Sequence, residues 1–232
     1  MLEGFENNRN EDKSVIFTAE YCFAALTDEE KTEWMNSRNE VHFEAGETII
    51  KQGFIASNIM LLEKGLAKLD IDTDGKLTTI GLIAPNSFIG IVCTFASHNV
   101  NFSSVAIEKT KISIFDIRMF EKLIRQNGEF AYRIIQHMSI VTNSLVRNIS
   151  RFSHKNIDGS LSILLLEFSE IYKSDSFVLP VKREEMAQML GYSKESVINT
   201  LSKFNKEDIL LVQDKKISIL DKEKLINIAK NG

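Results

Sequence analysis

The stretch from Lys194 to Asn199 places side chains with hydrogen-bonding chemistry at the start of a predicted helix. The side chains expected near its outward face are Lys194, Glu195, Ser196, Ile198 and Asn199. Ammonium, carboxylate, hydroxyl and amide groups in this position are typical of a recognition helix, whose first turns meet base edges in the major groove. The predicted chemistry is therefore recognition of double-stranded DNA, and no catalytic residue is expected.

Two short helices joined by a tight turn would position these side chains. Ala187 is small where a second helix must cross closely, and Gly191 follows four residues later, where the turn needs a positive φ. Ser193 can cap the second helix. The apolar residues expected to pack the two helices together are Met186, Leu190, Val197 and Leu201. An ordinary helical hairpin in another kind of domain is the alternative, because small-residue turns between helices are common.

The residues around this pair of helices favour a winged helix-turn-helix. Residues 160–172 form a strongly apolar predicted helix, which should provide the core of the domain. Two apolar runs, 209–212 and 216–220, flank a polar turn and predict a hairpin, a wing whose tip lysines reach phosphate. A closing helix is expected over 222–230. Lys182 and Lys215 complete the predicted DNA contacts.

Composition limits the class of protein. A chain of 232 residues is long enough for one large or two modest domains. The net charge is −4, but residues 151–232 hold 13 Lys and Arg against 12 Asp and Glu, so the acidic excess lies away from the predicted DNA reader. Cys22 and Cys93 are too few for a disulfide scaffold or a four-thiolate cluster. Without a signal peptide or an apolar run of about 20 residues, we expect a cytoplasmic protein with no membrane partner.

The first half of the chain alternates short apolar runs with glycine turns. Asp74-Gly75 is a strong hairpin signal, and residues 112–115 alternate in the manner of a half-buried strand. Many short antiparallel strands at this spacing predict a β-roll of cupin or jelly-roll type. The expected class is α+β, with an effector-sensing roll domain (1–128), a long dimerisation helix and hinge (129–157) and a winged helix-turn-helix domain (158–232).

A ligand pocket is expected where residues 87–95 and 101–104 of the roll come together. The residues predicted to line it are Phe88, Gly90, Ile91, Val92, Phe102 and Ser103. The competing interpretation is that the aromatic residues are core side chains. Cys93 is interpreted as a small buried apolar residue, with redox sensing as the alternative.

A long helix is predicted from residue 129 to 152, a segment without proline or glycine. Positions at alternating spacings of four and three form a heptad seam, which comprises Ile134, Met138, Val141, Leu145, Asn148 and Phe152. One seam needs a partner, so we predict a parallel homodimer that places two recognition helices in successive major grooves. A plain amphipathic helix packed on its own roll would show similar positions, and Asn148 either fixes the register or lies at a solvated helix end.

These parts, in this order, resemble the Crp–Fnr family of bacterial transcription regulators. The likeness covers about residues 41–225 and depends on residues 43–49, Gln52-Gly53, Gly65, Asp74-Gly75, residues 88–90 and residues 187–201. The resemblance implies an effector-gated homodimer that binds a near-palindromic operator and contacts RNA polymerase. It also implies that Glu195 accepts a hydrogen bond from a cytosine amino group. Asn199 looks to stand where many members have a base-reading arginine, and an asparagine there suits adenine.

The sequence departs from the family pattern at the predicted pocket. Cyclic-nucleotide-binding members have a glutamate after the pocket glycine and an arginine further along, whereas here Ile91 follows Gly90 and residues 101–104 carry no arginine. A buried phosphate would lack its charge partner, so cyclic AMP is not the expected effector. The oxygen-sensing branch needs a cysteine cluster that this chain lacks. The histidines that could ligate haem are His42, His98, His137 and His154, which we interpret as surface or seam residues, so no cofactor or metal is predicted.

Two other functions compete with effector-gated regulation. One is a constitutive regulator whose pocket has decayed, which leaves the roll purely structural. The other is a cupin-like metal enzyme, which would need histidines and a carboxylate clustered on the strands. His42 and His98 stand alone without a nearby H-x-H pattern, which disfavours the enzyme.

Overall fold

A computed structural model describes residues 18–95, 99–153 and 155–232, and its contacts divide the chain into two compact units. Within the described residues, the first unit holds the chain up to Leu69 and Leu82–Leu145, and the second holds Asp70–Gly81 and Val146–Gly232. The helix α5 (Gly128–Ser153) passes from the first unit into the second. No helix in the described part of the chain is both long and apolar enough to cross a bilayer.

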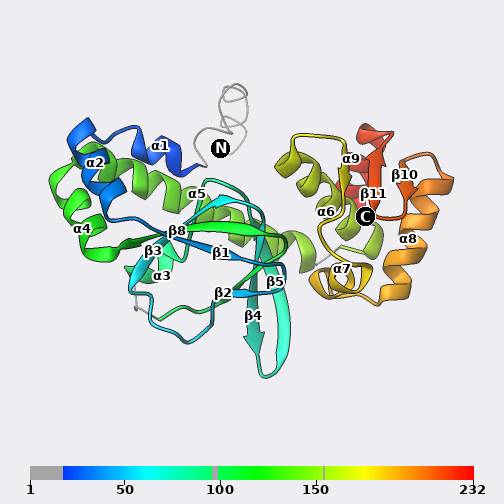
Figure 1. Cartoon of the computed structure of the whole chain (residues 1–232). Coiled ribbons are helices and arrows are strands. Elements are labelled where there is room, and N and C mark those ends of the chain that lie inside the picture. The colour runs from blue at the N-terminus through cyan, green and yellow to red at the C-terminus, as the bar shows by residue number, and fades with distance from the viewer. Residues whose placement is uncertain (1–17, 96–98, 154) are drawn as a thin grey trace, which may run out of the picture. The chain divides into compact units, whose positions relative to one another are not determined.

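Eight short strands form the roll, in two four-stranded sheets with the orders β1-β8-β3-β6 and β2-β7-β4-β5 (Figure 1). The strands are β1 (Asn39–Phe43), β2 (Thr48–Ile50), β3 (Asn58–Lys64), β4 (Ala67–Thr73), β5 (Lys76–Ile83), β6 (Ser87–Ile89), β7 (Ser103–Ala106) and β8 (Thr110–Asp116). Their registered pairings are antiparallel, as predicted. The predicted hairpin turn joins β4 to β5, with positive φ at both Asp74 and Gly75.

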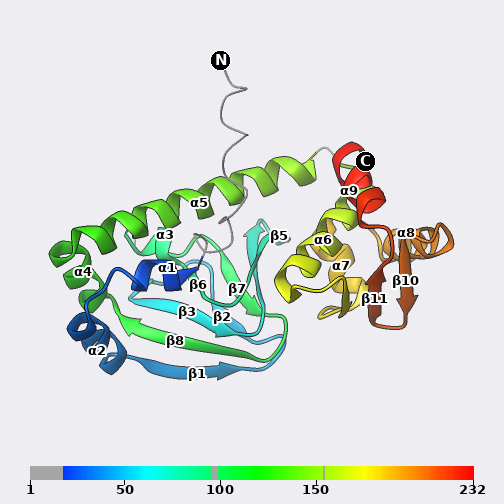
Figure 2. The same cartoon turned by 90° about the horizontal axis from the view of Figure 1, so that it is seen from above.

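Aromatic side chains join the roll to the helices at one of its ends. The helices α1 (Ala19–Phe23), α2 (Asp28–Asn36) and α4 (Ile117–Gln126) lie together there (Figure 2). Trp34 of α2 stacks on Phe115 of β8 with 3.7 Å between ring centroids, and Phe120 of α4 is fully buried against both Phe88 and Phe130. The short helix α3 (Ile91–Thr94) follows β6 directly.

The first half of α5 also belongs to this core. Ile134 is 2% exposed and His137 is 1% exposed, and the ring of His137 meets Phe88 edge-on at 5.4 Å. Burial lowers the pKa of His137, and no described group accepts or donates a hydrogen bond at its Nδ1. The opposite side of the helix exposes Tyr132 and Ile135.

The second unit contains α6 (Ile157–Tyr172), α7 (Arg183–Leu190), α8 (Lys194–Lys206) and α9 (Lys222–Asn231) around a three-stranded sheet. The sheet has the order β10-β11-β9, from the strands β9 (Ser176–Val178), β10 (Leu210–Gln213) and β11 (Lys216–Ile219). The apolar helix predicted over 160–172 is α6, and Leu161, Leu165 and Phe168 on it are fully buried. Asn156 caps its start, because the Asn156 side chain accepts from the Gly159 amide at 3.0 Å.

Candidate nucleic-acid interface and effector region

The turn between α7 and α8 forms by the local interactions that the sequence predicts. Gly191 ends α7 in the left-handed region with φ +73°, where a side chain would be strained. The Ser193 hydroxyl accepts from the Ser196 amide at 3.1 Å and so caps the start of α8. Val197 and Leu201 of α8 are buried, as are Met186, Ala187 and Leu190 of α7, so the two helices form one packed unit.

The same packing turns the polar side of α8 to solvent. Lys194, Glu195, Ile198 and Asn199 are exposed, and only Ser196 of the predicted set is half-buried, because it takes part in the cap. Glu195 and Asn199 lie one helical turn apart on one face. Both side chains face solvent, the Glu195 carboxylate beside the Lys194 ammonium.

Lys194 has a partner within the protein. Its ammonium lies 2.5 Å from a carboxylate oxygen of Glu184 on α7. The pair lowers the pKa of Glu184 and raises that of Lys194, and both groups face solvent. A phosphate would compete with Glu184 for this ammonium, so contact with DNA there requires exchange of an exposed ion pair, which is worth little.

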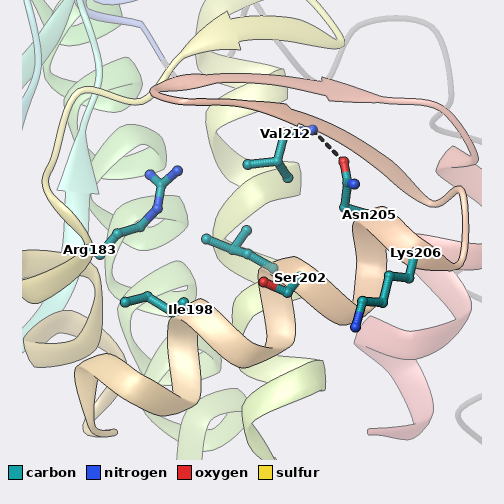
Figure 3. A pocket seen from close by; sticks show the side chains of 7 residues that line it. Arg183, Ile198, Ser202, Asn205, Lys206 and Val212 are labelled. Carbon is teal, nitrogen blue, oxygen red and sulfur yellow. Dashed lines mark hydrogen bonds between the residues drawn. The ribbon is translucent and has the colours of Figure 1, made fainter.

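A hollow of about 350 Å³ lies between α8 and the wing strand β10 (Figure 3). Its lining consists of Arg183, Ile198, Leu201, Ser202, Asn205, Lys206 and Val212. Asn205 holds the wing against the helix, because its side-chain oxygen accepts from the Val212 amide at 2.8 Å. Arg183 reaches the wing turn and donates to the Asp214 carbonyl at 2.6 Å. The wing is thus fixed to both helices of the reader.

The predicted phosphate contacts lie at two other edges of the reader. Lys182 is exposed immediately before α7, where its own amide donates to the Glu185 carboxylate at 2.8 Å. Lys215 is exposed in the turn between β10 and β11, next to Asp214, which has φ +53°. Both lysines are therefore exposed to solvent, and their contact with phosphate stays a prediction.

The start of α6 is tied to the recognition helix. Asp158 accepts from Lys203 Nζ at 2.6 Å and from the Thr200 hydroxyl at 3.2 Å. The Tyr192 hydroxyl, in the turn before α8, donates to the Lys155 carbonyl at 2.6 Å. Lys155 and Asp158 thus connect the segment between α5 and α6 to the turn before α8 and to α8 itself.

The predicted effector residues lie around the turn from β6 into α3. Gly90 makes this turn with φ +79°, and Phe88 and Ile91 on either side are 7% and 2% exposed. Val92 and Phe102 are half-buried, and the Ser103 hydroxyl accepts from the Gln52 amide at 3.0 Å. The Phe102 ring edge lies 3.9 Å from the place where a Cβ on Gly90 would stand. The side chains facing this turn are therefore mainly apolar.

Two family models match the chain. The model of the Crp-like helix-turn-helix domain matches residues 161–228, and the model of the cyclic nucleotide-binding domain matches residues 40–127. The nitrogen fixation regulation protein FixK of Bradyrhizobium diazoefficiens is 26% identical over 216 residues, which cover 89% of this chain and 88% of FixK.

Solved structures share the fold. FixK2 from Bradyrhizobium japonicum matches with a TM-score of 0.74 and 17% identity, over 82% of this chain and 96% of FixK2. A putative Crp/Fnr-family regulator from Eubacterium rectale matches with a TM-score of 0.70 and 19% identity, over 90% of this chain and 97% of that one. The chain belongs to the Crp–Fnr family.

As a Crp–Fnr protein, the chain is a transcription regulator with a DNA-binding helix-turn-helix and a cyclic-nucleotide-binding fold. The fold alone does not determine which ligand the domain binds. The segment that follows Gly90 supplies the buried Ile91 where cyclic-nucleotide-binding members carry a glutamate. Among the described residues, no group of three His, Cys, Asp or Glu side chains could hold a metal ion.

The structure places the members of the predicted seam in different environments. Ile134 is buried within the core of its own roll unit and offers no surface to a partner, which removes it from the seam. Met138, Val141 and Leu145 are half-buried, whereas the side chains of Asn148 and Phe152 lie outside the described part of the protein. Of the histidines considered for haem, His42 is exposed on β1, His137 is buried, and His98 and His154 lie outside the described residues.

Four residues at the hollow between α8 and the wing were not predicted from the sequence: Arg183, Ser202, Asn205 and Lys206. Ser202 and Lys206 stand four and eight residues after Ile198, so helical spacing alone could have added them to the exposed face of α8. Arg183 could not be found in this way, because its contact with the wing joins residues 31 positions apart.

Proposed function

We propose that this regulator binds a near-palindromic operator as a homodimer and is gated by an effector other than cyclic AMP. The observation that carries the proposal is the capped, rigidly packed helix α8, which exposes Glu195 and Asn199 beside a wing fixed by Asn205 and Arg183. Residues held in this way present fixed hydrogen-bonding groups to a major groove. RNA polymerase is the further partner that the family implies.

The predicted DNA-contacting residues of the helix-turn-helix and wing fall into three proposed roles: base reading, phosphate contact and apolar contact. Glu195 accepts from a cytosine amino group and Asn199 bonds adenine bidentately. Lys182, Lys194, Lys215 and Ser196 contact phosphate or hold the register, and Ile198 makes an apolar contact. The exposed Lys206 at the rim of the hollow adds a phosphate contact. The base pair read by Asn199 would therefore differ from that read by an arginine.

The homodimer would form along α5. Without Ile134, the accessible apolar surface of this helix includes Ile135 and Val146, which are about 60% exposed, and the half-buried seam residues Met138, Val141 and Leu145. Ile135, Met138 and Leu145 keep heptad spacing. A two-fold axis along this helix would give two recognition helices one helical turn of DNA apart, about 34 Å.

Gating would act through the junction of α5 and α6. Asp158 and the Lys155 carbonyl hold α8 through Thr200, Lys203 and Tyr192. An effector controls DNA affinity only if it binds one arrangement of this junction more tightly than another. The buried contact of His137 on α5 with Phe88 links the helix to the predicted effector region.

The residues around Gly90 disfavour cyclic AMP on electrostatic grounds. A phosphate placed at Gly90 would meet the buried Ile91 and the Phe102 ring, and residues 101–104 supply no guanidinium to neutralise it. An anion that loses water without gaining a charge partner is strongly disfavoured. The effector of this region is therefore expected to be uncharged, or absent as in the constitutive alternative.

Light scattering and calorimetry test the proposal. The purified protein is expected to have the mass of a dimer, and Ile135→Asp is expected to shift it to a monomer, whereas Val178→Asp, an equally exposed control in the second unit, leaves the dimer intact. Titration with cyclic AMP is expected to give no heat of binding. A monomeric wild-type protein would contradict the dimer, and stoichiometric cyclic AMP binding would contradict the effector assignment.

A further inference from the structure

A cavity of about 620 Å³ in the roll unit has a lining that differs from the residues around Gly90. It opens between the helices α1 and α2 and the strands β3 and β8. Its lining residues are Glu20, Phe23, Ala24, Leu26, Lys31, Trp34, Met35, Arg38, Leu61, Glu63, Lys64, Asn86 and Phe115. None of them belongs to the predicted effector set. The volume lies within the range of about 300–1,000 Å³ that is typical of small-molecule sites.

The floor of this cavity is apolar and rigid. Trp34 stacks on Phe115, and Phe23 packs against Trp34 at 5.3 Å between ring centroids. Leu61 and Leu26 are 8% and 4% exposed beside these rings. The start of α1 is fixed to the roll, because the Ala19 amide donates to the Asn86 carbonyl at 2.7 Å. Trp34 and Phe115 are themselves 3% and 1% exposed, so the apolar surface open to a ligand comes from the half-buried Phe23 and from Met35, which is 52% exposed. This surface favours the apolar part of a ligand.

The residues that line this cavity include more basic than acidic side chains. Arg38 and Glu63 neutralise each other at 3.3 Å, and Glu63 also pairs with Lys111 at 3.1 Å. Lys64 is exposed and forms no ion pair with a described residue, and Lys31 lies 3.8 Å from a fully exposed Asp28. Arg38 also pairs with Glu40, so Lys64 is the basic lining residue without a described carboxylate partner. Counted over the lining alone, Lys31, Arg38 and Lys64 outnumber Glu20 and Glu63 by one positive charge, which favours a ligand with a single negative charge.

We propose that this cavity binds an amphipathic organic carboxylate, whose acyl or aryl body lies against Phe23 and Met35 over the Trp34–Phe115 pair and whose carboxylate faces Lys64 and Lys31. The proposal concerns a second ligand site and stands whether or not the region around Gly90 takes an effector. Phe23 contacts both Phe88 and Phe130. Because Phe130 lies in the first turn of α5, a ligand in this cavity would lie next to aromatic residues that pack against α5.

The protein contains one tryptophan, Trp34, so its fluorescence reports this cavity directly. The full-length protein is titrated with sodium octanoate, with 1-octanol as the uncharged probe of equal chain length. We expect a saturable change in emission with octanoate and weaker binding of octanol. Higher salt is expected to weaken octanoate binding but not octanol binding.

Matched charge reversals test the role of the rim. Lys64→Glu is expected to weaken octanoate binding about fivefold, a size that suits an exposed charge pair turned repulsive. Lys31→Glu should act in the same direction. Lys51→Glu, an exposed lysine outside the cavity, is expected to leave the affinity unchanged. All three side chains are exposed, so the variants are expected to fold.

Three results would overturn the proposal. They are no saturable response to octanoate, equal affinities for octanoate and octanol, and equal effects of Lys64→Glu and Lys51→Glu. The first would exclude the site, and the others would exclude recognition of the carboxylate.

Discussion

Gly191 and Gly90 make similar turns, yet the segment after Gly191 is exposed to solvent and the segment after Gly90 is buried. Each glycine has a positive φ, +73° and +79°, and each leads directly or within three residues into a helix. After Gly191 the helix exposes Glu195 and Asn199, whereas after Gly90 it buries Ile91 at 2% exposure. A glycine turn therefore sets the path of the backbone, and the next side chains decide whether the site offers hydrogen bonds or fills a core.

The largest expected effect on DNA binding comes from removing the exposed polar side chains of α8, the helix that follows Gly191. Glu195→Ala combined with Asn199→Ala should weaken binding to the selected operator at least about 100-fold, because each base contact contributes about 1–3 kcal/mol of discrimination. Binding to unrelated DNA, which depends on phosphate contacts, should change little. Fluorescence anisotropy measures both affinities, and Gln188→Ala on the exposed side of α7 serves as control. An equal loss on both DNAs would contradict base reading.

The difference between the two turns can also be tested by placing a carboxylate at Ile91, the buried residue that follows Gly90. Ile91→Glu should reduce the free energy of unfolding by about 3 kcal/mol, because the charge would be buried without a partner. It should not create cyclic AMP binding, since the arginine is still missing. Urea unfolding and calorimetry measure the two outcomes, with the exposed Val178→Glu as control. A stable Ile91→Glu protein that binds cyclic AMP would show that the turn retains a phosphate site.

A smaller, pH-dependent effect is expected from His137, which packs on Phe88 next to the Gly90 turn. Burial lowers its pKa in the folded protein below the ordinary value of 6.5. The unfolded chain then binds more protons, so this residue favours folding fully above about pH 6.5 and loses that contribution as the pH falls. His137→Leu should flatten the loss of unfolding free energy between pH 7 and 5, by less than about 1.4 kcal/mol per pH unit. An unchanged slope would contradict a buried neutral imidazole.

The smallest effect is expected at the wing tip. Lys215→Ala should weaken binding to any DNA by less than about 1 kcal/mol and lower the salt dependence by about one counterion per protomer. Anisotropy titrations between low and moderate salt measure the slope. A loss confined to the operator would instead indicate that Lys215 reads a base.

Features set by neighbouring residues could be predicted from the sequence. The turn at Gly191, the cap at Ser193 and the hairpin at Asp74-Gly75 depend on contacts a few residues apart, and the structure contains all of them. The strand β9 was missed, because three residues, Ser176–Val178, carry no alternation and are ordered by pairing with β11.

Features set by distant residues could not be predicted. A heptad pattern does not distinguish a partner helix from the core of the same chain, so Ile134 was assigned to the seam although it packs inside the roll unit. Arg183 was missed because its wing contact is distant in sequence. The cavity over Trp34 brings together residues from Glu20 to Phe115, and no local pattern marks it.

Selection of bound duplexes from a random DNA pool by the full-length protein at low salt is the most direct test of the central claim. The account predicts a two-fold symmetric consensus, and it predicts that Glu195→Ala and Asn199→Ala each relax the preference at one defined position of both half-sites. A single unpaired half-site would contradict the dimeric reader. A consensus unchanged by both substitutions would contradict the assignment of α8 as the helix that reads the bases.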